Sequence, residues 1–400
     1  MSEQPLKPCV LLTSNQYKPN IGGIENSLFH LAQEYKKLGY EVIIVASDLN
    51  PENNVLPQYE VEDNIIIHRY EAEQTSGFGR GFKHIFNATK TYRKILKQYN
   101  PSLTVCRFHF NLVILKIAGY KNIVYLVPGV VENETKASLR HQNTFIGLIK
   151  SKISFFLHKN MQHFAFKNCD KLFVFSENMR TQIRNINKSK PISICKPGVS
   201  LTRFTTLHPN EKSKLRDSLN LSSQGKVFLC IGRFVKAKGF DTAIKALSKL
   251  DNENVQLWLL GEGPEENELR ELSAELGLIK QVKFLGRQSL PETYYKAADF
   301  FIMSSTYEPL GQTILEALCC GLPIIGSQSS DSVVTATSEI LQPSDNMLIM
   351  HHTPEAFSHG MMECLNLTES EYLTLQAENR KLAEKRFSWK KLAKELLSND

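Results

Sequence analysis

The regular alternation of short apolar runs with longer amphipathic segments is the feature that most constrains the fold of this chain. The first cycle has an apolar run at 10–12, a loop with Gly22 and Gly23, an amphipathic helical pattern at 24–38 and a second apolar run at 41–48. Strand, glycine loop, helix and strand in this order are typical of a parallel doubly wound sheet. Because a new cycle begins at 226, we predict an α/β chain with two Rossmann-like domains facing each other across a cleft.

The remaining elements follow the same pattern. Further strands are predicted at 64–70, 102–108, 122–129, 171–176 and 192–198, and then at 226–234, 256–263, 282–286, 299–305 and 322–327. Helices are predicted at 82–99, 145–168, 177–186, 239–250, 265–276, 291–298 and 311–320. With a linker near 198–212, the predicted domains are 1–198 and 199–375, followed by a C-terminal helix over 376–400 that packs back on the first domain.

Length and composition agree with two ordinary globular domains. The chain has 400 residues, of which 42% are hydrophobic and 22% charged, enough for two sizeable cores. No apolar run reaches the roughly 18 residues of a membrane span, and the first residues do not resemble a signal peptide. Eight scattered cysteines lack any Cys-x-x-Cys spacing. We therefore expect a cytoplasmic protein with reduced thiols and neither a zinc site nor a disulfide framework.

Positive charge is concentrated in the first half of the chain. Residues 1–198 contain 26 Lys and Arg against 15 Asp and Glu, whereas the remainder contains 22 against 26. Within this half, 145–168 combines apolar residues at helical spacing with Lys150, Lys152, Lys159 and Lys167. The pattern fits either a helix packed on its own sheet with a solvated basic face, or a peripheral contact with anionic lipid at the inner face of the plasma membrane. A basic nucleic-acid-binding surface is the third reading.

The segment 304–321, SSTYEPLGQTILEALCCG, carries the first chemical signal. It places Glu308 in a turn before a short apolar helix that contains Glu316. The backbone amides of this helix N-terminus, together with the helix dipole, suit a phosphate. Two glutamates at this separation also occur by chance, so the rest of the chain must decide whether they form a nucleotide-sugar site.

Two cations supply the second signal. In GRFVKAKG, Arg233 follows a buried strand and Lys238 lies just before the next helix. Both are expected at the carboxyl edge of the second sheet, where ligands of such sheets bind, and Arg is suited to bidentate contacts with phosphate oxygens. The chain contains no Asp-x-Asp. We therefore expect leaving-group stabilisation by these cations without a metal or other cofactor.

In their order, these motifs resemble the family-4 retaining glycosyltransferases of the GT-B architecture. The resemblance rests on GR-x4-KG, LLGEGP, FLGR and SS-x2-EPLG-x4-EAL-x2-G in the second half. In the first half it rests on GGIE, an apolar strand ending in His109, FSENM and KPGVSLTRF. Three positions depart from the usual pattern: SQSSDSVVTATSE replaces a Gly-Gly loop, and Ser200 and Arg107 replace an Asp and a His.

The resemblance implies a role for each matched residue. Arg233 and Lys238 would hold the donor diphosphate, and Glu316 would bind the ribose hydroxyls. Glu308 would contact the transferred sugar, and His109 would lie near it. The implied catalytic residues are Arg233, Lys238, Glu308 and His109. The other implied donor-binding residues are Gly22, Gly23, Gly263, Gly286, Arg287, Leu310, Gly311, Gln312 and Thr313.

The implied activity is transfer of a sugar from a nucleoside diphosphate, expected to be UDP, with retention of configuration. The acceptor would be a saccharide or a lipid-linked molecule in bacterial polysaccharide or lipopolysaccharide synthesis, bound on the side of 1–198. A carboxylate nucleophile is the usual route to retention in glycosidases, but the family implies a front-face reaction in which Glu308 positions the sugar. The alternatives are a sugar-nucleotide epimerase or a phosphorylase of the same architecture, or a non-catalytic nucleic-acid-binding protein; no nucleic-acid partner is expected.

Overall fold

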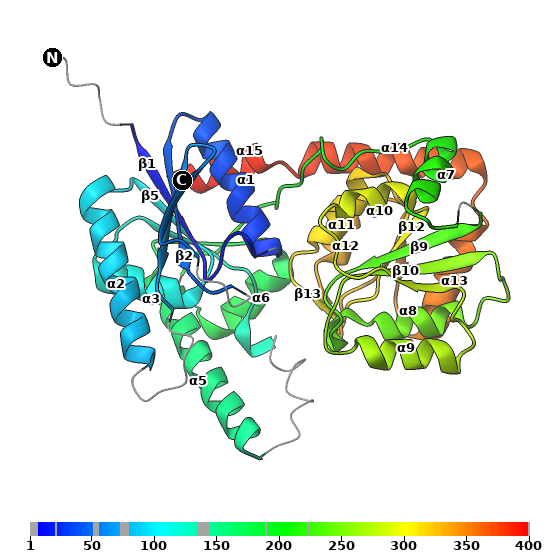
Figure 1. The fold of residues 1–400 in the computed structure, drawn as a ribbon, viewed down its shortest axis with the longest axis horizontal. Helices are drawn as coiled ribbons and strands as arrows, with labels where there is room; N and C mark the ends of the chain where they lie inside the picture. Colours follow the sequence, from blue (N-terminus) through cyan, green and yellow to red (C-terminus); the bar gives the residue numbers. More distant parts are fainter. Residues whose placement is uncertain are drawn as a thin grey trace. The chain divides into compact units, whose positions relative to one another are not determined.

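The chain divides into two compact units, which are described separately. The computed structural model describes residues 7–20, 22–50, 56–72, 80–133, 145–188, 190–222 and 224–398. Unit 1 comprises residues 1–198 and 389–400, and unit 2 comprises residues 199–388 (Figure 1). The first boundary lies where the linker was predicted. The second lies at Ser388, so residues 376–388 of the predicted C-terminal helix are part of unit 2.

Unit 1 is built on an eight-stranded sheet with the order β3-β4-β2-β1-β5-β6-β7-β8. Every pairing is parallel except β3 with β4. In the central register, Leu11 of β1 lies between Ile43 and Thr104, and all three are fully buried. The strands are β1 (Cys9–Thr13), β2 (Glu41–Ser47), β3 (Tyr59–Glu62), β4 (Ile65–Tyr70), β5 (Leu103–Cys106), β6 (Ile123–Leu126), β7 (Lys171–Val174) and β8 (Ser193–Ile194).

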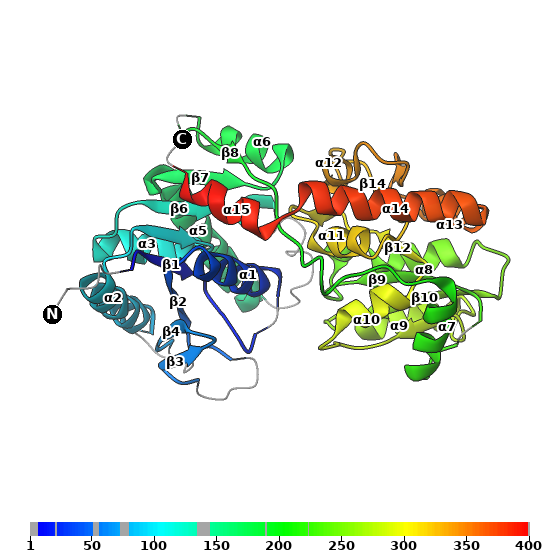
Figure 2. The same cartoon turned by 90° about the horizontal axis from the view of Figure 1, so that it is seen from above.

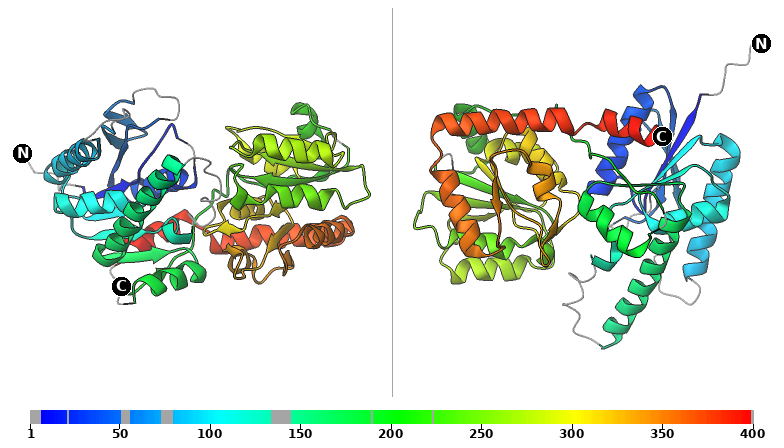
Figure 3. Two further views of the ribbon diagram at one scale, coloured as in Figure 1. Left: turned by 90° about the horizontal axis from the view of Figure 1, so that it is seen from below. Right: turned by 180° about the vertical axis from the view of Figure 1, so that it is seen from behind.

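Helices cover both faces of this sheet. On one face α1 (Gly23–Lys37) packs with α15 (Trp389–Leu397), where Trp389 stacks on His30 with ring centroids 5.0 Å apart (Figures 1 and 2). On the other face α3 (His109–Ala118) packs against both α2 (Arg80–Tyr99) and α5 (Phe145–Asn168), as Figure 3 shows from behind. Helix α6 (Glu177–Ile186) connects β7 to β8.

Unit 2 contains an all-parallel sheet with the order β11-β10-β9-β12-β14-β16. Alternate residues of β9 enter two different cores: Val227 and Leu229 face one, and Phe228 and Cys230 face the other. This is the pattern of a strand buried on both faces. The strands are β9 (Lys226–Ile231), β10 (Val255–Leu260), β11 (Val282–Phe284), β12 (Phe300–Met303), β14 (Ile324–Ser327) and β16 (Met347–Ile349), with a separate parallel pair of β13 (Tyr307–Glu308) and β15 (Val334–Thr335).

The helices of unit 2 form two layers. Helices α8 (Phe240–Leu247), α9 (Glu266–Glu275) and α13 (Pro354–Leu365) cover one face. The other face carries α7 (Pro209–Ser218), α10 (Pro291–Ala297), α11 (Gln312–Cys319), α12 (Thr337–Leu341) and α14 (Glu369–Arg386). The C-terminal segment is thus two helices, α14 and α15. Phe387, between them, is buried in the core of unit 2, which explains why the chain stays with this unit up to Ser388.

The interpretation of His109 as the end of a strand is wrong. Strand β5 ends at Cys106, and His109 is the first residue of α3. The helix 109–118 was not predicted, because its sequence HFNLVILKIA is almost entirely apolar and lacks the polar positions that mark a helical period. Gly119, with φ +96°, ends this helix in the left-handed region.

Candidate functional site

Lys238 is held at the carboxyl edge of the second sheet by a close approach of two loops. It ends a 3₁₀ turn, Lys236–Lys238, and Gly239 follows with φ +62°. A Cβ on Gly239 would lie 2.2 Å from the carbonyl oxygen of Ser304, so only glycine allows this contact. The Ser304 hydroxyl donates to the Lys238 carbonyl oxygen over 2.9 Å. The loop after β9 is therefore fixed against the end of β12.

Glu308 contacts two of the groups predicted to bind the donor. Its Oε2 contacts Lys238 Nζ, and its Oε1 accepts a hydrogen bond of 3.1 Å from the Gly311 amide. Both side chains of the pair are partly exposed, at 22% for Lys238 and 12% for Glu308. The carboxylate predicted to meet the sugar thus pairs with the ammonium predicted to meet the diphosphate.

Helix α11 begins directly behind this pair. Gly311 is its N-cap, with φ +72°, and no side chain caps the helix. A Cβ on Gly311 would approach Ile340 Cδ1 to 2.6 Å. Gln312 and Thr313 lie in the first turn of α11, where backbone amides and the helix dipole favour an anion.

Glu316 lies one turn further along α11 and is buried, with 9% exposure. The Tyr295 hydroxyl donates to Glu316 Oε2 over 2.8 Å. Burial raises the pKa of Glu316 to about 7, against smaller opposing effects from the Tyr295 hydrogen bond and the positive charge of Arg203. The carboxyl group therefore titrates near neutral pH.

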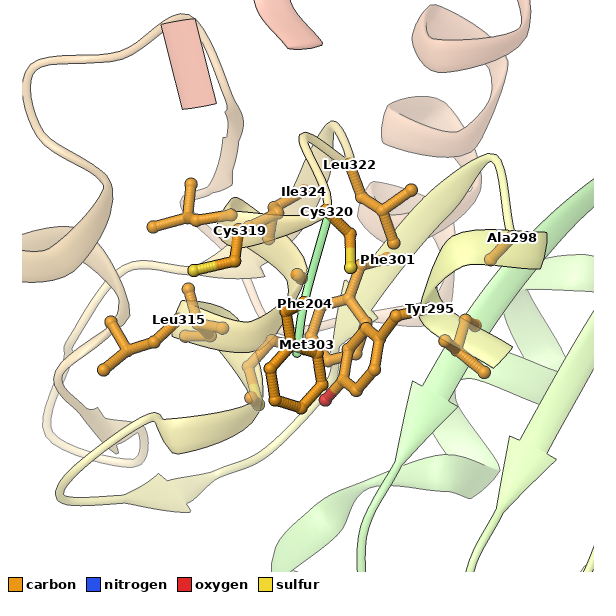
Figure 4. Close-up of a cluster of buried hydrophobic side chains, with 14 of the residues drawn as sticks. Phe204, Tyr295, Ala298, Phe301, Met303, Leu315, Cys319, Cys320, Leu322 and Ile324 are labelled. Carbon is orange, nitrogen blue, oxygen red and sulfur yellow. The ribbon is translucent and has the colours of Figure 1, made fainter. Parts of the chain in front are cut away.

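Tyr295 and Arg203 are functional candidates that the sequence did not indicate. The Tyr295 ring packs between Phe204 and Phe301, at centroid distances of 5.5 Å and 5.7 Å, within the cluster drawn in Figure 4. Arg203 forms an ion pair of 2.7 Å with Glu292 on α10. Tyr295 belongs to no motif, and Arg203 lies within KPGVSLTRF but was given no role there, because the proximity of both residues to Glu316 arises from packing between α10, α11 and the start of unit 2.

The other predicted donor-binding residues of unit 2 follow β9, β10 and β11, three neighbouring strands of the sheet. Arg233 is exposed directly after β9. A Cβ on Gly263 would lie 2.4 Å from the Phe234 carbonyl oxygen, so the loop after β10 packs on the loop after β9. Gly286, with φ +66°, accepts a hydrogen bond of 2.9 Å from the Gly261 amide, and Arg287 lies 3.6 Å from Glu262. Three loops therefore meet at the edge where Lys238 lies.

Gly22, Gly23 and His109 belong to unit 1. Gly22 is the N-cap of α1 and Gly23 its first residue. His109 is buried, and its Nε2 lies 2.7 Å from Nδ1 of His158 on α5. Burial, with a smaller effect of His158, lowers the pKa of His109 to about 3, so its ring is neutral at physiological pH. His158 was not singled out by the sequence, since 49 residues separate it from His109.

Among the residues that the structure describes, no group of three or more His, Cys, Asp or Glu side chains is placed to hold a metal ion. Within the same residues, none of the helices has both the length and the apolar character needed to cross a bilayer.

Two family models match the chain, one on each unit. Residues 21–203 match the model "Glycosyltransferase Family 4", and residues 211–382 match the model "Glycosyl transferases group 1". Among curated proteins, the lipopolysaccharide core biosynthesis glycosyltransferase LpsE of Rhizobium meliloti is 40% identical over 114 residues. That alignment covers 28% of this chain and 33% of LpsE, so only a third of the length of this relative is spanned.

Solved structures of other proteins share this fold over almost the whole chain, although their sequence identity to it is low. Sucrose-phosphate synthase from Thermosynechococcus elongatus superposes with a TM-score of 0.79 at 20% identity, covering 98% of this chain and 97% of the other. The Anabaena protein HepE, solved in complex with UDP-glucose, gives a TM-score of 0.76 at 18% identity, with coverages of 97% and 98%. With both units matched by family models and the fold shared over its full length, the chain belongs to the family-4 glycosyltransferases of the GT-B architecture.

Proposed function

We propose that this protein transfers a sugar from a UDP-sugar to a saccharide or lipid-linked acceptor in bacterial polysaccharide or lipopolysaccharide assembly. The observation that carries the proposal is the contact of Glu308 with both Lys238 and the Gly311 amide at the N-terminus of α11. The UDP donor is supported by the likeness of the fold to HepE in complex with UDP-glucose, and the pathway by the similarity to LpsE.

The pair of Lys238 and Glu308 suggests how a donor enters the site. A diphosphate brings two negative charges, which compete with Glu308 for the Lys238 ammonium and for the amide at the start of α11. Displaced from these partners, the Glu308 carboxylate becomes free to accept hydrogen bonds from hydroxyl groups of the sugar. As the bond to the sugar breaks, negative charge grows on the diphosphate, and Lys238, Arg233 and the helix N-terminus stabilise it more than they stabilise the ground state.

The same contacts support a positioning role for Glu308 in a retaining reaction. Once the diphosphate has displaced these two partners, the Glu308 carboxylate remains beside Lys238 and the start of α11, where it is proposed to accept hydrogen bonds from sugar hydroxyls and not to attack the anomeric carbon. We infer a front-face reaction in which the leaving diphosphate assists attack by the acceptor. His109, with its neutral ring, is proposed as a hydrogen-bonding partner of the sugar and not as a charged acid.

We further propose that catalysis needs no metal ion, because fixed cations and a helix N-terminus supply the positive charge. UDP release from UDP-glucose or another UDP-sugar is expected to continue at an unchanged rate in the presence of EDTA. The anomeric proton coupling of the product, measured by NMR, is expected to show the configuration of the donor. Loss of activity in EDTA that Mg²⁺ or Mn²⁺ restores would contradict the first expectation. An inverted product would contradict the second, and absence of UDP release from every UDP-sugar would overturn the proposed function.

Peripheral contact with an anionic membrane is the remaining part of the proposal. Helices α2 and α5 both pack on α3, and their sequences contain six and four Lys or Arg residues with no Asp or Glu. Their described side chains include large exposed apolar groups, such as Phe82 at 82%, Phe86 at 67% and Phe156 at 64%. Exposed aromatic residues beside basic ones suit insertion at a lipid surface, with each Lys or Arg contributing about 1 kcal/mol on anionic membranes.

Vesicle co-sedimentation tests this contact. We expect binding to vesicles of phosphatidylcholine and phosphatidylglycerol that weakens at high salt. Phe82→Glu with Phe86→Glu should lower the bound fraction about tenfold, because two apolar insertions are lost and two negative charges are gained. Ile279→Glu in unit 2, where Ile279 is 69% exposed, is the matched control and should bind normally. Equal binding by the double variant and the wild type would show that α2 does not contact the membrane.

A further inference from the structure

A pocket of about 530 Å³ lies in unit 1 between the β3–β4 hairpin and helix α2, two neighbouring parts of the fold (Figure 2). The hairpin contributes Tyr59 and His68 to its lining. The spacing i, i+4, i+7 and i+11 places the polar lining residues of α2 on one helix face. They are Asn87, Thr91, Lys94 and Gln98.

This pocket is separate from the candidate functional site. Strand β2 lies between β4 and β1 in the sheet, whereas Gly22 follows β1 and His109 follows β5. Tyr99, which also lines the pocket, is the last residue of α2 and precedes the start of β5 at Leu103. The pocket therefore extends along the α2 face of the sheet towards its amino edge. Ligands of doubly wound sheets bind at the opposite, carboxyl edge.

His68 is a buried polar side chain in the wall of this pocket. It is 8% exposed, and its Nε2 has no hydrogen-bond partner among the described residues. The ring lies against two tyrosine rings, with centroid distances of 5.2 Å to Tyr59 and 6.3 Å to Tyr99. Burial, with a smaller effect of Lys94, lowers the pKa of His68, so its ring is neutral at pH 7. An unpaired buried nitrogen is unfavourable, and a ligand hydroxyl would supply the missing partner.

Tyr59 gives the pocket a flat aromatic surface. Its side chain is 56% exposed although its backbone is paired with His68 in the hairpin. The residues around it are fixed by Arg69, which is 3% exposed: its Nη1 donates to the Pro57 carbonyl oxygen over 3.0 Å, and its Nη2 to Glu60 Oε1 over 2.6 Å. The ring is thus presented on a well-held strand, and a ligand that stacks on it does not have to order the chain.

The polar groups of the pocket suit hydroxyl groups better than a phosphate. The side-chain amides of Asn87 and Gln98 and the hydroxyl of Thr91 each offer both a donor and an acceptor. A phosphate only accepts, so the amide oxygens and the Glu71 carboxylate in the lining would remain without a donor. A sugar ring has an apolar C–H face and an edge of hydroxyls that donate and accept. It therefore matches an aromatic surface bordered by amides.

We propose that this pocket is an accessory saccharide-binding site, in which one sugar ring stacks on Tyr59 and its hydroxyls bond with His68 Nε2 and with the amides of α2. The site would keep the growing saccharide on the protein between transfers, a role that rests on the proposed function. Binding of the saccharide itself needs neither donor nor turnover, so it is measurable on its own.

Saturation-transfer NMR with the full-length protein tests the site without UDP. The probes are maltose, lactose, mannobiose and chitobiose, each titrated to give a Kd. We expect at least one to bind, and Tyr59→Ala to weaken that binding about tenfold, because the stacking surface is lost. Val61→Ala is the matched control: Val61 is also on β3, is 53% exposed and lies outside the pocket lining, and this variant should bind as the wild type does.

Two further variants separate recognition from a structural role. His68→Phe keeps an aromatic ring between the two tyrosines and removes the nitrogen, so it should keep the fold and weaken binding at least about threefold. Unchanged saccharide affinity in this variant would refute the role of His68. Tyr59→Trp enlarges the stacking surface and should bind at least as tightly as the wild type. It decides the question if Tyr59→Ala fails to fold, since weaker binding by a folded tryptophan variant would contradict stacking.

The remaining outcomes distinguish this site from other sites and from the proposed function. If no probe binds in a manner that depends on Tyr59, the proposal is refuted, whether or not UDP is released from a UDP-sugar. Inorganic phosphate that binds and is lost in Lys94→Ala, without saccharide binding, would identify an anion site instead. A parallel loss of UDP affinity in Tyr59→Ala would assign the pocket to the donor. A protein that releases no UDP but binds a saccharide through Tyr59 would contradict the proposed function and support the saccharide site.

Discussion

Replacement of Lys238 by alanine is expected to lower kcat by about 10²- to 10³-fold, the range found when one group that stabilises developing charge is removed. The Lys238 ammonium contacts Glu308, and it is proposed to contact the diphosphate of the donor. Because negative charge on the leaving diphosphate is largest in the transition state, the loss should appear in kcat and in kcat/KM alike. The measurement is UDP release at saturating and at limiting donor concentration.

The fold should survive this change, because Lys238 is not part of a core. Lys245→Ala is a matched control: Lys245 lies on the adjacent helix α8, is 44% exposed, and forms an ion pair of 3.2 Å with Asp241. It should retain full turnover. A Lys238→Ala enzyme with near-normal kcat would refute the diphosphate role, and a variant that raises only KM would place Lys238 in ground-state binding.

Much of the fold was predictable because the two units repeat one local pattern. Predicted helices at 177–186 and 145–168 coincide with α6 and α5. Helix α6 has clear ends, because the Ser176 side chain caps its N-terminus and Asn187 follows its last turn. The helix that begins at His109 was not predicted, because a nearly continuous apolar run has no helical period to recognise. It packs against α2 and α5, and Gly119 in the left-handed region ends it.

The candidate site was only partly predictable for a related reason. Lys238, Glu308 and Gly311 lie in glycine-containing turns with clear spacing, and the structure brings these three into direct contact. The contacts of Tyr295 and His158 depend on packing between elements distant in sequence. Sequence spacing alone does not report which polar atom of a buried side chain finds a partner.

The titration of Glu316 predicts how stability depends on pH. The pKa of this carboxyl is raised from 4.5 to about 7 in the folded chain, because ionisation in a buried place is unfavourable. A raised carboxyl pKa leaves stability unaffected below pH 4.5 and reduces it as pH rises towards 7, beyond which the loss is constant. The rise of this pKa from 4.5 to about 7 corresponds to a loss of about 3 kcal/mol in the free energy of unfolding. Glu316→Gln should therefore gain up to about 3 kcal/mol over the wild type at pH 8 and little at pH 4.5, as measured by urea unfolding.

Donor affinity should show the opposite preference, because ribose hydroxyls are proposed to donate to the ionised carboxylate. UDP binding by the wild type is expected to strengthen as pH rises through about 7, by roughly tenfold for a charge-assisted bond. Binding by Glu316→Gln should stay weak and flat over this range. Tyr295→Phe is the companion variant: without the 2.8 Å hydrogen bond that lowers the pKa of Glu316, the rise in affinity should move to higher pH. Calorimetry at pH 6, 7 and 8 distinguishes these outcomes. If wild-type UDP affinity does not change across that range while the stability curves diverge, Glu316 is a buried structural acid and some other group holds the ribose.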